Sequence, residues 1–100
     1  MAEVWWSSWI PPVVPYAVLL RLFVDGNLTA DEFEVIFLPL YKNDPTQWPS
    51  DLFDVLDTLF ADVDAYCSND DLRAEVRGLD AEQLRDRAER AFGRLKDLAQ

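Results

Sequence analysis

Residues 51–75 read DLFDVLDTLFADVDAYCSNDDLRAE. Apolar residues recur in the first part of this stretch at intervals of three and four, which is the spacing of one face of an α-helix. That face comprises Leu52, Phe53, Val55, Leu56, Leu59, Phe60, Val63 and Cys67. The same stretch carries eight carboxylates and a single basic residue, Arg73. It therefore predicts a helix that packs through one face while its edges hold a large negative charge.

The segment that starts at the first prolines predicts another helix. Pro11, Pro12 and Pro15 lead into residues 16–25, which are apolar on nearly all sides. Such a pattern is typical of a central or interface helix. Gly26 follows at a position that suits the left-handed conformation after a last helical turn.

A capping box marks the start of the next helix. Thr29 has Glu32 three residues later, and Leu28 and Phe33 occupy the two positions of a hydrophobic staple. Pro39 lacks a backbone N–H, so we expect it to kink or end this helix.

Cap signals also divide the remaining chain. Ser50 is predicted to open the acidic helix. Ser68, with Asp71 three residues later, is predicted to cap a short turn, and Asp80, with Gln83, opens the last helix. The last helix then carries a narrow apolar seam of Leu84, Ala88, Ala91, Phe92, Leu95 and Leu98.

Four helical patterns joined by short loops, without strand-like alternation, predict an all-α fold, specifically a small antiparallel four-helix bundle. A chain of 100 residues has the size of one domain. We therefore expect residues 1–100 to form a single helical domain. Residues 1–11 would be an N-terminal extension that packs on the bundle, with Trp5, Trp6 and Trp9 as its contacts.

The composition argues against several classes of function. The net charge of −10 argues against binding to nucleic acid or to an anionic membrane and favours a basic partner. The chain has no histidine and only one cysteine, Cys67, which excludes a Cys/His zinc site and an internal disulfide. The segment DVDAYCSNDDLR lacks the glycine and the glutamate that an EF-hand requires. We expect no metal, no cofactor and no enzymatic activity.

The location of the protein is predicted from the same features. The apolar run of residues 10–20 is too short to span a bilayer, and Glu3 stands where a signal peptide has positive charge. A single cysteine is compatible with a reducing compartment. These features predict a soluble, cytoplasmic protein.

The negative charge is concentrated in one part of the chain. Residues 43–75 hold nine acids and one base, whereas residues 76–100 hold five acids and six bases. On a helical wheel with Asp51 at 0°, the apolar face of the acidic helix spans roughly 40° to 200°. Asp57 and Asp64 then lie at about 240° and 220°, and Asp54 lies near them at about 300°. Asp51 and Asp62 fall on the opposite edge, near 0° and 20° in the same projection, at about 100° per residue.

We predict that this acidic stripe binds a basic partner. The candidate partner-binding residues are Trp48 at the rim, Asp54, Asp57 and Asp64 on the helix, and Asp70, Asp71 and Glu75 in the following turn. A structural explanation is the alternative, because acidic helix faces are often merely solvated. Asp51 and Asp54 also suit the helix dipole, and Asp64 is expected to pair with an arginine such as Arg73 or one from the last helix.

Three segments of the chain resemble the bacterial self-protective colicin-like immunity family, which includes the colicin D immunity protein. They are LLRLFVDGNLTADEFEVIFLPLY, LFDVLDTLFADVDAYCSNDDLR and LDAEQLRDRAERAFGRL. The resemblance extends from about residue 18 to residue 98 and has no counterpart for the N-terminal MAEVWWSSWIPP.

The resemblance implies a small helical bundle that inactivates a cognate toxin domain, typically a ribonuclease that attacks tRNA. In that family acidic residues cover the basic cleft where the RNA would lie. We therefore expect a basic nuclease toxin domain as the partner, and a free protein that is a monomer or a weak dimer. The alternative is an acidic helical adaptor or regulator that binds another basic protein.

Overall fold

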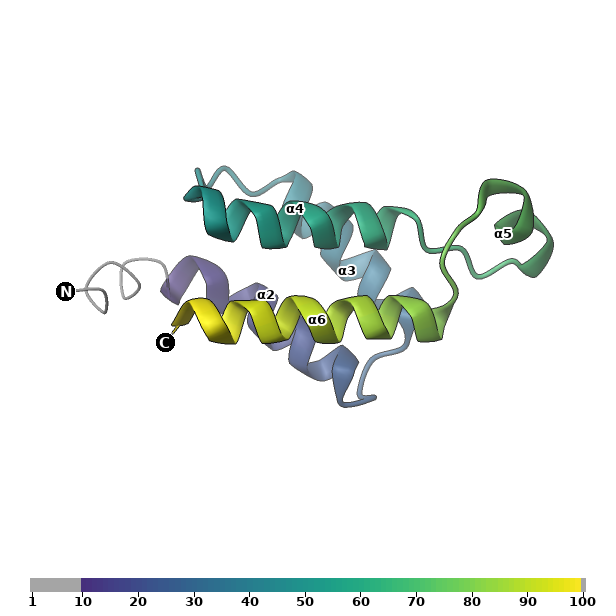
Figure 1. Cartoon of the computed structure of the whole chain (residues 1–100), viewed down its shortest axis with the longest axis horizontal. Coiled ribbons are helices and arrows are strands. Elements are labelled where there is room, and N and C mark those ends of the chain that lie inside the picture. Colours follow the sequence, from purple (N-terminus) through teal and green to yellow (C-terminus); the bar gives the residue numbers. More distant parts are fainter. Residues whose placement is uncertain (1–9, 100) are drawn as a thin grey trace.

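The computed structural model describes residues 10–99, and the side chains of residues 12–98, as an all-helical chain (Figure 1). Its helices are α2 (Ile10–Val24), α3 (Ala30–Lys42), α4 (Ser50–Asp64), α5 (Asp70–Val76) and α6 (Ala81–Ala99). The predicted all-α class is thus confirmed. The described part has five helices and not four, because the predicted turn after α4 contains the short helix α5. The N-terminal tryptophans lie outside the described residues, so their packing stays a prediction.

The core is built by the four longer helices. Figure 1 shows α4 and α6 side by side and running in opposite directions, with α2 and α3 oblique to this pair. The largest fully buried side chains are Tyr16, Leu20, Phe23, Phe33, Phe37, Leu52, Leu56, Leu59 and Leu84. Helix α5 contributes no buried residue. The predicted seam of α6 is confirmed at Leu84, Ala88, Ala91 and Leu95, which are buried.

Helix α2 begins earlier than the prolines suggested. It starts at Ile10, so Pro12 and Pro15 lie inside it. Pro12 lies in the first turn, where the backbone N–H groups have no partner within the helix, whereas Pro15 lies beyond that turn and removes one intrahelical hydrogen bond. One face of α2 is buried, whereas Val14 and Val18 are about half exposed. The glycine after the helix, Gly26, has the predicted left-handed conformation, with φ of 85°.

The predicted N-terminus of α3 is confirmed, whereas of the two outcomes expected at Pro39, a kink or an end of the helix, the end does not occur. The Thr29 hydroxyl accepts a hydrogen bond from the Glu32 amide at 3.1 Å, and the Glu32 carboxylate accepts one from the Thr29 amide at 2.9 Å. The helix does not end at Pro39 and continues to Lys42. Phe37 and Tyr41 on either side of the proline stack on each other with ring centroids 5.9 Å apart, which offsets the missing hydrogen bond.

Helix α4 begins at Ser50, as predicted, but ends earlier than its apolar pattern indicated. Its N-cap is Pro49, with no side-chain cap from Ser50, and it ends at Asp64. Phe53, predicted to face the core, is 49% exposed. Cys67, also predicted for the core, lies beyond the helix and is only partly buried.

The chain leaves α4 through a single parallel β-bridge between Tyr66 and Leu79. The Cys67 amide donates to the Leu79 carbonyl at 2.9 Å, and the Leu79 amide donates to the Ala65 carbonyl at 2.9 Å. Gly78 is required beside this bridge, because a Cβ there would lie 2.7 Å from the Ala65 carbonyl oxygen. The bridge closes the loop that carries α5.

The start of α5 also differs from its prediction. Asn69, and not Ser68, is the N-cap, and its side chain accepts a hydrogen bond from the Leu72 amide at 2.9 Å. Among the described helices, none combines the length and the apolar character needed to cross a bilayer.

Candidate functional site

The edge of α4 that faces α6 carries acids that are neutralised within the fold. Arg94 of α6 donates a hydrogen bond to the Asp54 carboxylate at 2.5 Å, and Arg87 donates one to Asp62 at 3.3 Å. The Asp62 side chain is only 16% exposed. Burial raises the pKa of Asp62, although Arg87 and Arg90 both act to lower it. This edge is therefore a packed, charge-balanced contact between two helices.

The opposite edge of α4, which faces α3, carries acids without basic partners. Asp57 and Asp64 are exposed, and neither makes a hydrogen bond or an ion pair with any described residue. On α3, Glu34 is half-buried near Asp64. Burial, together with the negative charges of Asp31 and Asp64, raises the pKa of Glu34. We call Asp31, Glu34, Asp57 and Asp64 the acidic edge.

The predicted stripe of three aspartates on α4 therefore divides. On the helical wheel Asp54 lies between the two edges of α4. Its ion pair with Arg94 places it on the edge that faces α6. The expectation that Asp64 pairs with Arg73 or with an arginine of the last helix is wrong, since Arg73 pairs with Asp70 at 2.6 Å and Asp64 has no ion pair within the described residues. Asp64 is left at the C-terminal end of α4, where the helix dipole disfavours a negative charge.

An open groove of about 520 Å³ lies beside Asp57, between the end of α3, residues 43–49 and the first half of α4. Aromatic rings and two carboxylates dominate its walls. The lining residues are Tyr41, Lys42, Asp44, Thr46, Gln47, Trp48, Phe53, Asp57 and Phe60. The structure thus brings Trp48 and Asp57, both predicted from the sequence, into one concave surface.

The groove is held in shape from within the core. The hydroxyl of buried Tyr16 donates a hydrogen bond to Asp44 at 2.6 Å, and the second Asp44 oxygen accepts one from the Thr46 amide at 2.9 Å. Burial raises the pKa of Asp44, but these hydrogen bonds outweigh it and lower the pKa overall. Burial and the bond to Asp44 raise the pKa of Tyr16. The Tyr16 ring also meets the Trp48 ring edge-on, with centroids 5.9 Å apart. Residues 43–49 are therefore anchored to α2.

The predicted acids after α4 lie at the other end of the molecule. Figure 1 shows α5 beyond one end of the α4–α6 pair, whereas residues 43–49 lie at the other end. Helix α4 alone separates them by about 22 Å, at 1.5 Å per residue. Trp48 and the acids of α5 therefore cannot contact the same small feature of a partner.

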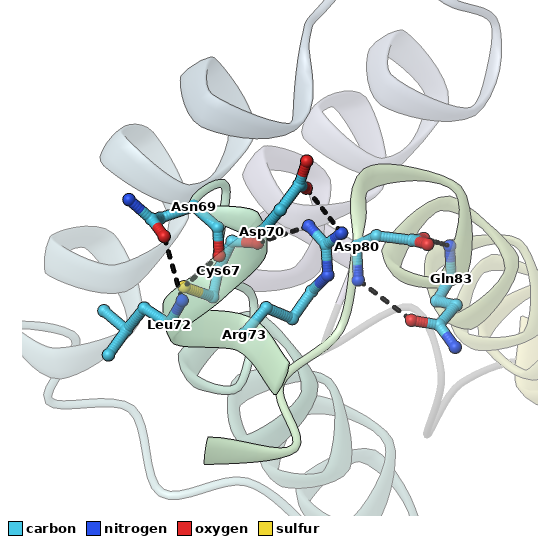
Figure 2. Close-up of polar contacts among 7 residues, drawn as sticks. All are labelled: Cys67, Asn69, Asp70, Leu72, Arg73, Asp80 and Gln83. Atoms are coloured by element: carbon cyan, nitrogen blue, oxygen red, sulfur yellow. Dashed lines mark hydrogen bonds and ion pairs between the residues drawn. The ribbon is translucent and has the colours of Figure 1, made fainter. Parts of the chain in front are cut away.

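Within α5 the acids differ from one another, and Figure 2 shows the contact of Asp70 with Arg73. Arg73 pairs with Asp70 and also donates a hydrogen bond to the Cys67 carbonyl at 3.1 Å. Asp71 and Glu75 are exposed and have no ion pair within residues 10–99. No group of three or more acidic, cysteine or histidine side chains in the described part of the chain is arranged to hold a metal ion.

Sequence reasoning missed the basic residues that divide the stripe. Arg87, Arg90 and Arg94 recur at intervals of three and four, so they share one face of α6, and this spacing was a usable signal. The i,i+4 spacing of Asp86 and Arg90 on the last helix also predicts a pair, but this pair is not among the ion pairs of the described residues. Arg90 instead lies near Asp62.

Sequence reasoning also missed the hydrogen bonds of Asp44 that hold the groove in shape. Asp44 precedes a proline, and its bond to the Thr46 amide is the turn that an aspartate at such a position often makes. That signal was visible in DPT, but the partnership with Tyr16, 28 residues away, was not.

Residues 13–95 match the family described as bacterial self-protective colicin-like immunity. No curated protein and no solved structure is significantly similar to the chain.

Proposed function

The chain belongs to the bacterial self-protective colicin-like immunity family, and from this premise we propose that it binds and inhibits a cognate ribonuclease toxin of the kind that attacks tRNA. The acidic edge would cover the basic cleft in which the toxin holds its RNA. The toxin would then be blocked by occlusion, with no chemical step carried out by this protein.

The observation that supports this proposal is that Asp57 and Asp64 of the acidic edge have no basic partner within the described residues. The acids on the α6 side of α4 are matched by arginines, whereas Asp57 and Asp64 have none within the described residues. Burial, and then the negative charges of Asp31 and Asp64, raise the pKa of Glu34 and so disfavour its charged form. A fold keeps such a cost when a cationic partner can relieve it.

The proposed interface extends from the acidic edge in both directions. Trp48 would be an aromatic contact at one end, and Asp70, Asp71 and Glu75 would contact basic residues at the other. Asp54 would take part by exchanging Arg94 for a toxin residue, since its side chain is 67% exposed. The central contribution is assigned to Asp57 and Asp64.

A charge reversal tests the proposal. We expect Asp57→Lys with Asp64→Lys to weaken binding to the toxin domain by about 100-fold or more, because two favourable interfacial charges become repulsive. The toxin domain would be captured from the producing strain and identified by mass. Affinity would be measured by calorimetry at two salt concentrations, and protection by co-expression with the toxin.

A matched control separates the local effect from the change in net charge. Asp86→Lys with Glu89→Lys changes the net charge by the same amount on the exposed side of α6. We expect this control to weaken binding by less than about tenfold, through long-range attraction that salt screens. Full protection by the Asp57/Asp64 variant, with its helical circular dichroism intact, would refute the proposed interface.

A further inference from the structure

The groove beside Asp57 has the composition of a binding site for one cationic side chain. Phe53 is 49% exposed at its edge, which is unusual for a phenylalanine on a helix whose other large apolar residues are covered. Tyr41 and Phe60 form a second wall, with ring centroids 5.3 Å apart. The face of an aromatic ring carries partial negative charge and attracts a cation that lies over it.

The two carboxylates of the groove are not equivalent. Both oxygens of Asp44 already accept hydrogen bonds, from Tyr16 and Thr46. Asp44 therefore adds negative charge to the groove but is less available to bind an incoming cation. Asp57 has no hydrogen bond and no ion pair within the described chain. Burial, then Asp57, then Asp44 raise the pKa of Tyr41, which places both charges close to its phenol. Asp57 is therefore the carboxylate that an incoming cation can bind.

The chain already places a cation of its own at this wall. The Lys42 ammonium lies 5.9 Å from the centroid of the Phe60 ring. It shows that the aromatic wall accommodates a positive charge beside the groove. Lys42 is at an exposed position on the last turn of α3, so little opposes its displacement.

We propose that the groove receives one arginine side chain of the toxin, with its guanidinium paired to Asp57 and stacked on the rings of Phe53 and Phe60. The arginine takes the place of the Lys42 ammonium at the Phe60 ring. A guanidinium fits better than an ammonium because it is planar, less strongly hydrated, and able to pair with a carboxylate while it stacks on a ring. This inference rests on the proposed function.

A direct test uses a small probe and does not need the toxin. The intact protein would be titrated with N-acetyl-arginine amide, and the aromatic signals of Phe53 and Tyr41 would be followed by NMR. We expect saturable shifts with a Kd in the millimolar range, weaker shifts with N-acetyl-lysine amide, and none with the neutral citrulline analogue. Asp57→Asn should abolish the shifts, whereas Asp86→Asn should not. Equal responses to arginine and citrulline, or no saturable shift, would overturn the proposal.

A second test uses the toxin domain and two lysines that occupy similar positions. Lys42 lies over Phe60 in the groove, and Lys96 lies over Phe92 on α6, 5.3 Å from the ring centroid. Lys42→Gln should tighten toxin binding severalfold more than Lys96→Gln, although both remove one positive charge. Phe53→Ala should weaken binding by about tenfold, and its partial exposure predicts little loss of stability.

Different results would contradict the proposed function and the proposed arginine site. Binding that depends on Asp57 and Asp64 but is unchanged by Phe53→Ala and Lys42→Gln would retain the proposed function and overturn the arginine site. A failure to bind any toxin domain would overturn the proposed function, while the titration with arginine amide would still decide whether the groove holds a guanidinium.

Discussion

The two edges of α4 carry the same residue type in opposite circumstances. Towards α6, Asp54 and Asp62 contact arginines, and Asp62 is largely covered. Towards α3, Asp57 and Asp64 are exposed beside Glu34, a further acid. One edge therefore contributes to the fold, and the other is available to a partner. The difference shows that the charge of a helix says little about binding until the facing helix is known.

The largest expected effect on the free energy of unfolding comes from replacing an aspartate by lysine, and it should differ between the two edges of α4. Asp62→Lys should lower the free energy of unfolding by about 2 kcal/mol, between the values for exposed and buried pairs, because a lysine would lie against Arg87 and Arg90. Asp57→Lys should change it by less than about 0.5 kcal/mol, as is usual for exposed positions. Urea denaturation measures both. Equal losses for the two variants would remove the distinction between the edges.

A smaller loss of stability is expected when the hydrogen bond that supports the groove, from Tyr16 to Asp44, is removed. Tyr16→Phe should cost about 1 kcal/mol, because it removes a part-buried hydrogen bond to Asp44. It should also speed hydrogen exchange at the Thr46 amide, since Asp44 then loses an anchor.

Tyr66→Phe is the matched control for Tyr16→Phe. The Tyr66 hydroxyl donates to Asp31 at 2.7 Å near the surface, and burial together with this bond raises the pKa of Tyr66 to about 12. We expect a smaller loss of stability from this variant and no change at Thr46. Thr46 exchange that is unchanged by Tyr16→Phe would show that α2 does not hold the groove.

The smallest effect concerns the repulsion within the acidic edge. The folded state raises the pKa of Glu34 above its ordinary value of 4.5, so the folded protein binds a proton there more readily than the unfolded chain. Stability from this group is complete below pH 4.5 and is lost as the pH rises through the raised pKa. Glu34→Gln should therefore stabilise the protein at pH 7 by a few tenths of a kcal/mol.

The pH dependence provides the control for this prediction. The advantage of Glu34→Gln should vanish in denaturation experiments below pH 4.5, where Glu34 is protonated in both states. Glu89→Gln on the exposed side of α6 should show no such dependence. An advantage for Glu34→Gln that is equally large at low pH would mean that it arises from something other than charge.

Local signals in the sequence predicted several features correctly. The capping boxes at Thr29 and Asp80 form as expected, with the Asp80 carboxylate accepting from the Gln83 amide at 2.8 Å. Gly26 takes the left-handed conformation. Each of these depends on residues within one turn of each other, so a short stretch of sequence contains all the partners. Pro39 does not end α3, and the residues on either side of it, Phe37 and Tyr41, also pack against Tyr16 of α2, which is distant in the sequence.

The sequence alone was sufficient for the helical class, the buried seam of α6 and the concentration of negative charge near α4. These follow from periodicity and composition, which are properties of consecutive residues. The tertiary structure was needed to divide that charge. Arg94 lies 40 residues from Asp54, and Tyr16 lies 28 residues from Asp44. Only the packing of α2, α3 and α6 around α4 brings such partners together, and it leaves Asp57 facing an open groove.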